Sequence, residues 1–301
     1  MEKLLITGGT GLVGSSINRG IKLSSKDGDL KNWKSTLDLF KQFMPKEVIH
    51  CAARVGGVGG NIKAKGEFFY DNIMMNTNVL EACRICNVQK VVSFLSTCIF
   101  PDAIEYPLTE KKIHLGAPHW SNYGYAYAKR MLDVQTTVYR DQYDVNFVSV
   151  IPTNIYGPND NFNLENGHVV PSLIHKCYLA KKNNTKFEVW GSGKALREFI
   201  YSKDIGRLTN WVLDSYDESE PIIFSTSEEI SIKDLVMLIV DAMNFKGSVI
   251  FDITKPEGQF RKPADNSKLK SYLPEFKFTT IADGIKETVN WFCENIETVR
   301  K

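Results

Sequence analysis

Leu4-Leu-Ile-Thr-Gly8-Gly-Thr-Gly11-Leu-Val-Gly14 is the stretch that decides the fold of this chain. A short apolar run ends in a G-x-x-G-x-x-G turn, and a helical pattern follows. The glycines allow a tight turn and let the backbone approach a pyrophosphate, while the helix N-terminus supplies N–H donors. Glycine-rich turns also join strands to helices where nothing binds, so this stretch alone leaves both interpretations open.

A second pattern, Tyr125-Ala-Tyr-Ala-Lys129, carries the candidate chemistry. Side chains four residues apart lie on the same side of a helix. An ammonium near a phenol can lower the pKa of the phenol from about 10 toward neutrality, so that the tyrosine can exchange a proton with a carbonyl oxygen. A Y-x-x-x-K match is frequent by chance, but in a chain that opens with a nucleotide-binding turn it predicts an oxidoreductase site.

Apolar strands and helical stretches alternate along the first half of the chain, which predicts an α/β fold. We expect a Rossmann-type doubly wound parallel sheet that helices cover on both faces. Ligands of such sheets bind at the carboxyl ends of the strands, so Gly8, Ala52, Ser96 and Thr153, just past four strand ends, should converge on one crevice. The expected strands are 4–7, 21–24, 48–51, 91–95 and 147–151, and the expected helices are 12–19, 34–43, 68–86 and 125–139.

The second half of the chain is less regular. We expect segments 200–213 and 221–225 to return to the first domain. This predicts an NADP-binding Rossmann domain of residues 1–165 plus about 200–228, and a smaller discontinuous α/β substrate lobe of residues 166–199 and 229–301. The elements expected in the lobe are helices at 170–181, 232–243 and 281–295 and a strand at 187–190.

Composition and charge narrow the class of protein. Apolar residues make up 43% of the chain and charged residues 24%, and the net charge of +2 gives no reason to expect nucleic acid or an anionic membrane as a partner. The chain lacks an apolar run of about 18 residues, and it opens directly on a strand rather than on a signal peptide. Six scattered cysteines suit a reducing, cytoplasmic location. The five histidines lack metal-ligand spacing, so we expect no metal site.

The glycine turn and the Tyr/Lys pair together resemble the extended short-chain dehydrogenase/reductase superfamily. Four further motifs are similar to those of the GDP-L-fucose synthase family: Leu95-Ser-Thr-Cys-Ile-Phe-Pro101, Pro152-Thr-Asn-Ile-Tyr-Gly-Pro-Asn-Asp-Asn-Phe162, Gly167-His-Val-Val-Pro171, and Val189-Trp-Gly-Ser-Gly193 with Arg197-Glu-Phe. Ser-Thr-Cys followed by Gly-His-Val is the discriminating pair, because other sugar-nucleotide members usually lack both the Cys and the His.

This resemblance implies a bifunctional NADPH-dependent 3,5-epimerase and 4-reductase that acts on GDP-4-keto-6-deoxy-D-mannose. The protons on C3 and C5 of a 4-keto sugar are both alpha to the carbonyl, so a base and an acid can invert each centre through an enolate. The family gives these roles to the positions of Cys98 and His168. After epimerisation Tyr125 would protonate O4, Lys129 would bind the nicotinamide ribose and lower the pKa of Tyr125, and Ser96 would hydrogen-bond O4.

The end of the second strand predicts the cofactor. An acidic residue there would bind the 2′-hydroxyl of NAD, whereas Ser24-Ser25-Lys26 favours the 2′-phosphate of NADP, although Lys26 could also be an ordinary surface lysine. Only eleven residues separate Gly14 from Lys26, so the first helix or the second strand must be short. By resemblance the cofactor-binding residues are Gly8, Gly9, Thr10, Gly11, Leu12, Val13, Gly14, Ser24, Ser25, Lys26, Asp29, Leu30, Ala52, Ala53, Leu95, Ser96, Tyr125, Lys129, Pro152, Thr153, Asn154, Ile155 and His168.

The resemblance also predicts the nucleotide-sugar site and a homodimer. Cations are needed for two phosphates, and the planar fork of an arginine suits them. Trp190 could equally belong to the core of the lobe. The predicted substrate-binding residues are Cys98, Asn154, Lys176, Trp190, Arg197 and, more loosely, Glu257. The homodimer would form through helices 68–86 and 125–139.

Two other functions remain open at this point. The chain could be a related sugar-nucleotide enzyme, such as a 4-epimerase or a 4,6-dehydratase. A 4,6-dehydratase typically carries Asp-Glu after the Ser/Thr, where this chain has Cys98-Ile99. It could also be a non-catalytic Rossmann protein that senses NADP, but such proteins often lose the Tyr or the Lys, and this chain has both.

Overall fold

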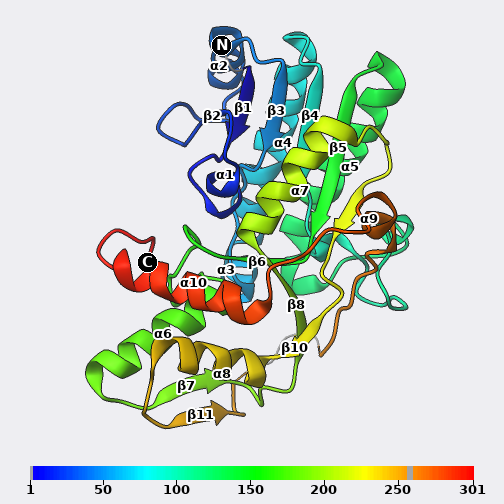
Figure 1. Cartoon of the computed structure of the whole chain (residues 1–301). Coiled ribbons are helices and arrows are strands. Elements are labelled where there is room, and N and C mark those ends of the chain that lie inside the picture. The colour runs from blue at the N-terminus through cyan, green and yellow to red at the C-terminus, as the bar shows by residue number, and fades with distance from the viewer. Residues whose placement is uncertain (1–2, 256–259) are drawn as a thin grey trace.

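A six-stranded parallel sheet forms the larger part of the computed structural model, which describes residues 3–255 and 260–301 (Figure 1). Its strand order is β2-β1-β3-β4-β5-β9, and each neighbouring pair is parallel. The reversal of strand order between β1 and β3 creates the crevice in which such folds bind ligands. The strands are β1 (Leu4–Thr7), β2 (Ile21–Lys22), β3 (Glu47–His50), β4 (Lys90–Phe94), β5 (Asn146–Pro152) and β9 (Ile222–Phe224).

Helices cover both faces of this sheet, as the alternating pattern predicts. Successive strand residues point to opposite faces, so Leu5 and Val48 join one buried cluster while Leu4 and Ile49 join another. Figure 1 shows α7 in front of the sheet and α4 and α5 behind it. The helices of this part are α1 (Leu12–Ser16), α2 (Trp33–Phe43), α3 (Val58–Lys63), α4 (Lys65–Ile85), α5 (Tyr123–Tyr143) and α7 (Ser202–Ser215).

The first helix and the second strand are both short, in agreement with the short spacing between Gly14 and Lys26. The helix expected at 12–19 ends at Ser16, because Ile17 has an extended backbone and is fully buried. Gly20 then turns the chain with φ +84°. The strand expected at 21–24 pairs with β1 only over Ile21 and Lys22.

A smaller α/β part lies below the large sheet in Figure 1 and has its own apolar cluster. It is built from a three-stranded sheet, a two-stranded sheet and three helices. The strands are β6 (Asn154–Tyr156), β8 (Leu196–Tyr201) and β10 (Glu229–Ser231) in the first sheet, and β7 (Phe187–Trp190) and β11 (Val249–Asp252) in the second. The helices are α6 (Val169–Asn183), α8 (Ile232–Met243) and α10 (Ile281–Glu294).

One segment assigned by sequence to the substrate lobe packs on the large sheet. Helix α9 (Ser267–Tyr272) contacts β9, and Leu269 belongs to the apolar cluster of the large sheet. Asn266 Nδ2 donates to the Ser225 carbonyl at 3.0 Å and so joins this segment to the end of β9. Across residues 3–255 and 260–301, the structure has no helix long and apolar enough to cross a membrane.

The packing of Gly14 against the glycine turn yields a first prediction. A Cβ at Gly14 would lie 2.5 Å from both the Gly8 carbonyl oxygen and the Gly9 Cα, which are backbone atoms that cannot rotate away. Gly14→Ala should therefore lower the free energy of unfolding by about 1–3 kcal/mol, as overpacking does, and weaken dinucleotide binding. Urea unfolding and a cofactor titration would measure both effects.

Gly59→Ala is the matched control, because a Cβ there would meet its nearest atom only at 3.9 Å. It should leave dinucleotide binding nearly unchanged and should not lower the free energy of unfolding, because alanine favours a helix more than glycine does. A Gly14→Ala variant as stable as the parent would show that the turn does not depend on this close approach.

Candidate active site

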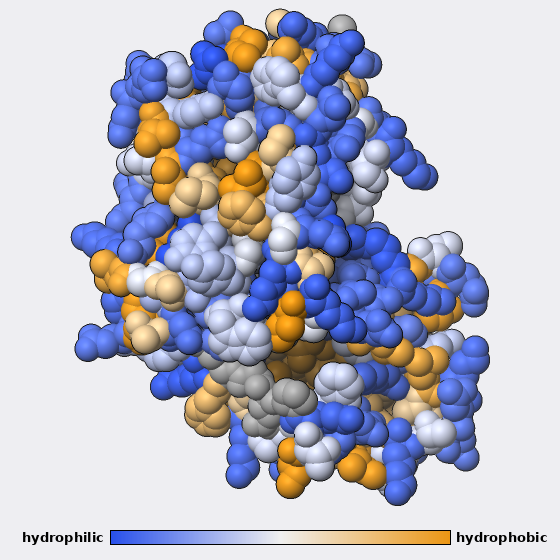
Figure 2. Space-filling model, turned by 180° about the vertical axis from the view of Figure 1, so that it is seen from behind, coloured by the Kyte–Doolittle hydropathy of each residue, from blue (hydrophilic) through white to orange (hydrophobic). Residues whose placement is uncertain are grey.

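The candidate site lies at the carboxyl ends of β1, β3, β4 and β5. Gly8 follows β1 directly, Ala52 comes two residues after β3, Ser96 two residues after β4, and Thr153 directly after β5. The strands are parallel, so these ends share one edge of the sheet. Figure 2 shows the surface hollowed where the larger upper part of the molecule meets the smaller lower part.

The glycine turn has the shape that a dinucleotide pyrophosphate needs. Gly8 has φ +66°, a conformation that favours glycine, and a Cβ there would lie 2.8 Å from the Ala52 backbone. A Cβ at Gly9 would lie 2.5 Å from the Lys22 Cβ. On the other side of the crevice, the buried Thr153 hydroxyl has no hydrogen-bond partner among the described residues. A close backbone approach and an unpaired hydroxyl both fit a bound dinucleotide.

The end of the second strand carries a carboxylate as well as the predicted cation. Lys26 is exposed, and its backbone N–H donates to Ser24 Oγ. The Ser24 backbone N–H and hydroxyl both donate to the Asp27 carboxylate, at 2.7 and 2.9 Å. These bonds hold the pKa of Asp27 below its usual value. The Ser24 hydroxyl is therefore already engaged, and Ser25 and Lys26 are the groups left to face a phosphate.

Tyr125, Ser96 and Cys98 form a polar group just past the carboxyl end of β4. Ser96 caps a short 3₁₀ turn, η1 (Thr97–Ile99), by accepting from the Cys98 backbone N–H at 3.3 Å. The Tyr125 hydroxyl lies close to both Ser96 and the Cys98 thiol, which each influence its pKa. Asn122 stands at the N-terminus of α5 without capping it, and its amide instead donates to Cys98 Sγ at 3.7 Å. Three predicted catalytic side chains thus meet in one place.

The pKa of Tyr125 shifts in the opposite direction to the sequence prediction. Burial raises it above the ordinary phenol value, the nearby Cys98 raises it further, and the Ser96 hydrogen bond lowers it only in part. The expected lowering by Lys129 is wrong for this structure: burial of the phenol is the largest cause of the shift, and Lys129 is not among its causes. Tyr125 is therefore protonated at neutral pH.

Lys129 is placed one helical turn from Tyr125, but its ammonium points to the sheet. Lys129 Nζ donates to the Phe94 carbonyl at 2.7 Å, and the residue is only 1% exposed. Burial lowers the pKa of Lys129 to about 8. The carbonyl at the end of β4 thus fixes the position of this cation.

His168 lies on a different element from the Cys98 and Tyr125 group. It is the residue before α6; the residue as a whole is exposed, while the protein around its ring lowers its pKa by desolvation. The loop beside it packs closely on the start of α3, where the Gly57 backbone N–H donates to the Asn166 carbonyl at 3.0 Å. A Cβ at Gly57 would lie 2.7 Å from the Gly167 carbonyl oxygen. This contact sets where the histidine stands.

The predicted substrate-side residues lie on the smaller part of the molecule. Lys176 Nζ stacks over the Trp190 ring at 4.4 Å, and Lys255 Nζ faces the same ring at 5.7 Å. Trp190 is 55% exposed, so it is not a core residue of the lobe. Burial lowers the pKa of Arg197, which also lies near Tyr106. Glu257 lies outside the described residues.

Lys262 is a residue of the site that the sequence analysis missed. It lies near Cys98, Arg197 and Asp102, and burial lowers its pKa. Its position links the thiol of the larger part to the arginine of the smaller part. The adjacent basic pair Arg261-Lys262, in the same segment as Lys255, was the only sequence signal that could have indicated it.

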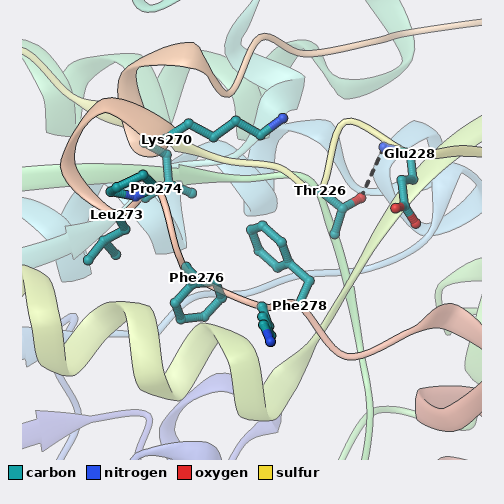
Figure 3. Close-up of a pocket in the computed structure, with 9 residues that line it drawn as sticks. Thr226, Glu228, Lys270, Leu273, Pro274, Phe276 and Phe278 are labelled. Atoms are coloured by element: carbon teal, nitrogen blue, oxygen red, sulfur yellow. Dashed lines mark hydrogen bonds between the residues drawn. The ribbon is translucent and has the colours of Figure 1, made fainter.

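The pocket shown in Figure 3 is separate from this site. It has a volume of about 450 Å³ and lies between the α9 segment and the turn after β9. The residues that line it are Thr226, Glu228, Leu269, Lys270, Leu273, Pro274, Phe276, Lys277 and Phe278. None of them is a predicted site residue. Among the described residues, no group of three or more His, Cys, Asp or Glu side chains is arranged to hold a metal ion.

Comparison with known proteins gives consistent matches. Residues 4–225 match the model of the NAD dependent epimerase/dehydratase family. A GDP-L-fucose synthase of Dictyostelium discoideum is 52% identical over 99% of this chain and 97% of its own length. A probable GDP-L-fucose synthase of Drosophila melanogaster is 43% identical over the full length of both chains. The crystal structure of a GDP-L-fucose synthetase from Naegleria fowleri bound to NADP superimposes with a TM-score of 0.95, at 47% identity, over 99% of this chain and 94% of that chain.

Proposed function

The chain belongs to the NAD dependent epimerase/dehydratase family, and we propose that within it this protein acts as a GDP-L-fucose synthase. It converts GDP-4-keto-6-deoxy-D-mannose to GDP-L-fucose by inverting C3 and C5 and then reducing the C4 ketone. Its cofactor is NADP(H). The observation that carries the proposal is the meeting of a thiol, Cys98, with the Tyr125 and Ser96 hydroxyls in one site. The most direct test is NMR identification of the product formed from the keto sugar nucleotide and NADPH.

In the reduction, Tyr125 donates a proton and Ser96 orients the ketone. When bound, NADPH supplies the hydride that the C4 carbon accepts. The developing O4 oxyanion then needs a proton and hydrogen-bond donors that are already in place. Tyr125 is protonated at neutral pH because burial raises its pKa, so it begins in the state that reduction requires. Ser96, within reach of the phenol, directs O4 toward that proton.

In the epimerisation, Cys98 takes a proton and His168 returns one to the opposite face of the sugar. Asn122 donates to Cys98 Sγ and so supports the thiolate when it forms. Lys262 adds a positive charge near the same sulfur. His168 approaches from α6, a different element, which suits delivery to the other face of the ring.

Cations on the smaller part bind the diphosphate of the substrate. Lys176 and Lys255 surround the Trp190 ring, and Arg197 lies next to Lys262. Burial lowers the pKa of both Arg197 and Lys262, so a bound anion would relieve the cost of their buried charges. The exposed Trp190 ring offers a flat apolar surface beside these cations.

The fit of the crevice supports the cofactor assignment. The turn at Gly8, Gly9 and Gly14 would hold the pyrophosphate, and Thr153 would meet the nicotinamide side with its unpaired hydroxyl. Lys26 would bind the 2′-phosphate of NADPH. All six cysteines are free thiols, which supports a reducing compartment, and we place the enzyme in the cytoplasm.

The two half-reactions should separate in variants of Tyr125 and Cys98. Tyr125→Phe removes the proton donor to O4, so NADPH oxidation should fall by about 10²–10⁴-fold. In D2O the same variant should still incorporate deuterium at C3 and C5. Cys98→Ser should lose this deuterium incorporation while slow reduction of the unepimerised ketone continues. NMR of the sugar and absorbance of NADPH would follow both steps.

Loss of both activities in a folded Tyr125→Phe variant that still binds substrate would contradict the division of roles. Normal yields of GDP-L-fucose from Cys98→Ser would show that another group inverts the sugar.

The role of Lys26 can be tested through cofactor preference. Lys26→Ala should raise the KM for NADPH and leave the KM for NADH nearly unchanged, because only NADPH carries the 2′-phosphate. Lys3→Ala, which changes an exposed lysine at the far end of β1, is the matched control. Equal losses with both cofactors would show that Lys26 does not recognise this phosphate.

The assembly we propose is a homodimer through α4 and α5. Exposed apolar side chains lie at helical spacing along α5, at Met131, Val134 and Val138, beside exposed Phe69 and Tyr70 on α4. The helices lie behind the sheet in Figure 1, so Figure 2 shows this face, with hydrophobic side chains among polar ones. Contiguous apolar patches of this kind are typical of protein interfaces. A two-fold axis would pair the same patch on both subunits.

Val134→Lys should convert the dimer to a monomer, because it places a charge in the middle of the apolar stripe. Met237→Lys is the control: Met237 is similarly exposed, at 43% against 38% for Val134, but lies on α8. Sedimentation velocity would measure both masses. A monomeric parent protein would refute the proposed assembly.

A further inference from the structure

A continuous chain of buried hydrogen bonds runs beneath the candidate active site. The Ala52 backbone N–H donates to Thr7 Oγ1 at 3.4 Å, and Thr7 Oγ1 lies 2.8 Å from His50 Nδ1. His50 Nε2 lies 3.0 Å from Asn76 Oδ1, and Asn76 Nδ2 donates to the Ala128 carbonyl at 3.3 Å. Thr7, His50 and Asn76 are at most 1% exposed. The chemical steps proposed above use none of these three side chains.

Chemistry gives this chain of bonds a single direction. The Ala128 carbonyl can only accept, so the amide nitrogen of Asn76 must face it and Oδ1 must face His50. His50 Nε2 therefore carries the hydrogen, and a neutral ring leaves Nδ1 as an acceptor for the Thr7 hydroxyl. The Thr7 oxygen in turn accepts from the Ala52 N–H. Each of these polar groups has its partner.

The arrangement requires His50 to be neutral. A protonated ring would turn Nδ1 into a donor toward Thr7, whose hydrogen would then have no acceptor. Burial, together with the Lys129 ammonium on α5, lowers the pKa of His50 to about 3. Besides Lys129, the ionisable Cys51 adjoins this region, and its own burial raises its pKa to about 12. Both groups therefore leave the ring uncharged at neutral pH.

The bonds join the glycine turn, on the cofactor side of the site, to the first turns of α5, which carry Tyr125 and Lys129. These two parts must be aligned for reduction. Thr7 immediately precedes Gly8 in the glycine turn, and Ala52 follows β3 across the crevice. Ala128 immediately precedes Lys129 and lies in the same turn of α5 as Tyr125. Reacting groups have to be held close to their productive geometry, and a displacement of about 1 Å can cost about 10²-fold in rate.

We propose that Thr7, His50 and Asn76 form a positioning relay that holds the first turns of α5 against the glycine turn. The relay keeps Tyr125 and Lys129 aligned with the cofactor side of the crevice. The role of the alignment rests on the proposed function, whereas the link to dinucleotide binding does not. Cys98 and His168 lie on other elements, so the relay serves reduction more than epimerisation.

Two substitutions of His50 separate positioning from simple stability. His50→Leu removes both ring nitrogens. His50→Gln keeps one acceptor for Thr7 and one donor for Asn76, so it can restore the relay. Thr7→Val, a change of nearly equal shape, removes only the hydroxyl. Thr136→Val is the control, because Thr136 is equally buried and its hydroxyl donates to the Leu132 carbonyl within α5 at 2.8 Å, outside the relay.

The variants would be compared by fluorescence titration with NADPH, urea unfolding, NADPH oxidation and deuterium exchange into the sugar. His50→Leu should raise the dissociation constant of NADPH about tenfold, as expected for lost buried hydrogen bonds. At saturating NADPH it should slow reduction about 10²-fold while exchange stays within about threefold. Thr7→Val should show smaller changes of the same kind. His50→Gln should recover most of both quantities, and Thr136→Val should match the parent.

Three results would overturn the relay. In the first, folded His50→Leu binds NADPH and reduces the sugar as well as the parent protein does. In the second, His50→Gln binds and reduces no better than His50→Leu. In the third, Thr7→Val loses reduction and deuterium exchange to the same extent. If His50→Leu does not fold, Thr7→Val decides, because it removes the same bond without a cavity. If the parent protein fails to convert the sugar nucleotide, the proposed function fails, and the NADPH dissociation constants still test the relay.

Discussion

Parallel pairing of the central strands is the constraint on which the rest of the molecule depends. Because β1, β3, β4 and β5 run in one direction, their carboxyl ends lie at a single edge. Hydrogen bonding continues past these ends: the Cys51 N–H donates to the Thr7 carbonyl at 3.1 Å, and the Leu95 N–H donates to the Val150 carbonyl at 2.8 Å. The residues that follow the strands are therefore held by backbone bonds before any side chain contributes. Groups more than a hundred residues apart in sequence meet there.

The sequence predicts those elements in which the apolar residues recur on the one face that the structure buries. The strand at 187–190 and the helix at 232–243 have the predicted bounds, because each presents one regular apolar face. The first helix ends earlier than predicted, since Ile17 leaves the helix to fill the apolar cluster of the large sheet. Helix α9 was also misplaced by the domain prediction: nothing in its local pattern shows that Leu269 packs on β9. Both differences come from contacts distant in sequence.

The sequence predicts the site residues that belong to recognisable motifs, but not their electrostatics. Tyr125, Ser96 and Cys98 do meet, as the motifs predict, but the direction of the Tyr125 pKa shift was wrong. The prediction counted the Lys129 charge and could not count the burial of the phenol, nor the Phe94 carbonyl that holds the ammonium. Lys262 has no motif, and the pairing of residues 263–265 with the distant Leu108 helps to hold it at the site. Electrostatics and long-range pairing depend on the whole fold, so local motifs do not predict them.

The connection between the two parts of the molecule rests on adjacent residues of β8. The buried Glu198 carboxylate accepts from the Ser225 hydroxyl at 2.6 Å and from the Ala264 N–H at 2.9 Å. It thereby ties β8 to the end of β9 and to the segment that carries Lys262. Successive strand residues face opposite ways, so Arg197 points away from this buried contact. The Asn154 amide donates to the Glu198 carbonyl at 2.7 Å and adds a bond from the residue that follows Thr153. The buried Glu198 carboxylate therefore helps to fix where Arg197 and Lys262 stand relative to the end of β9 in the large sheet.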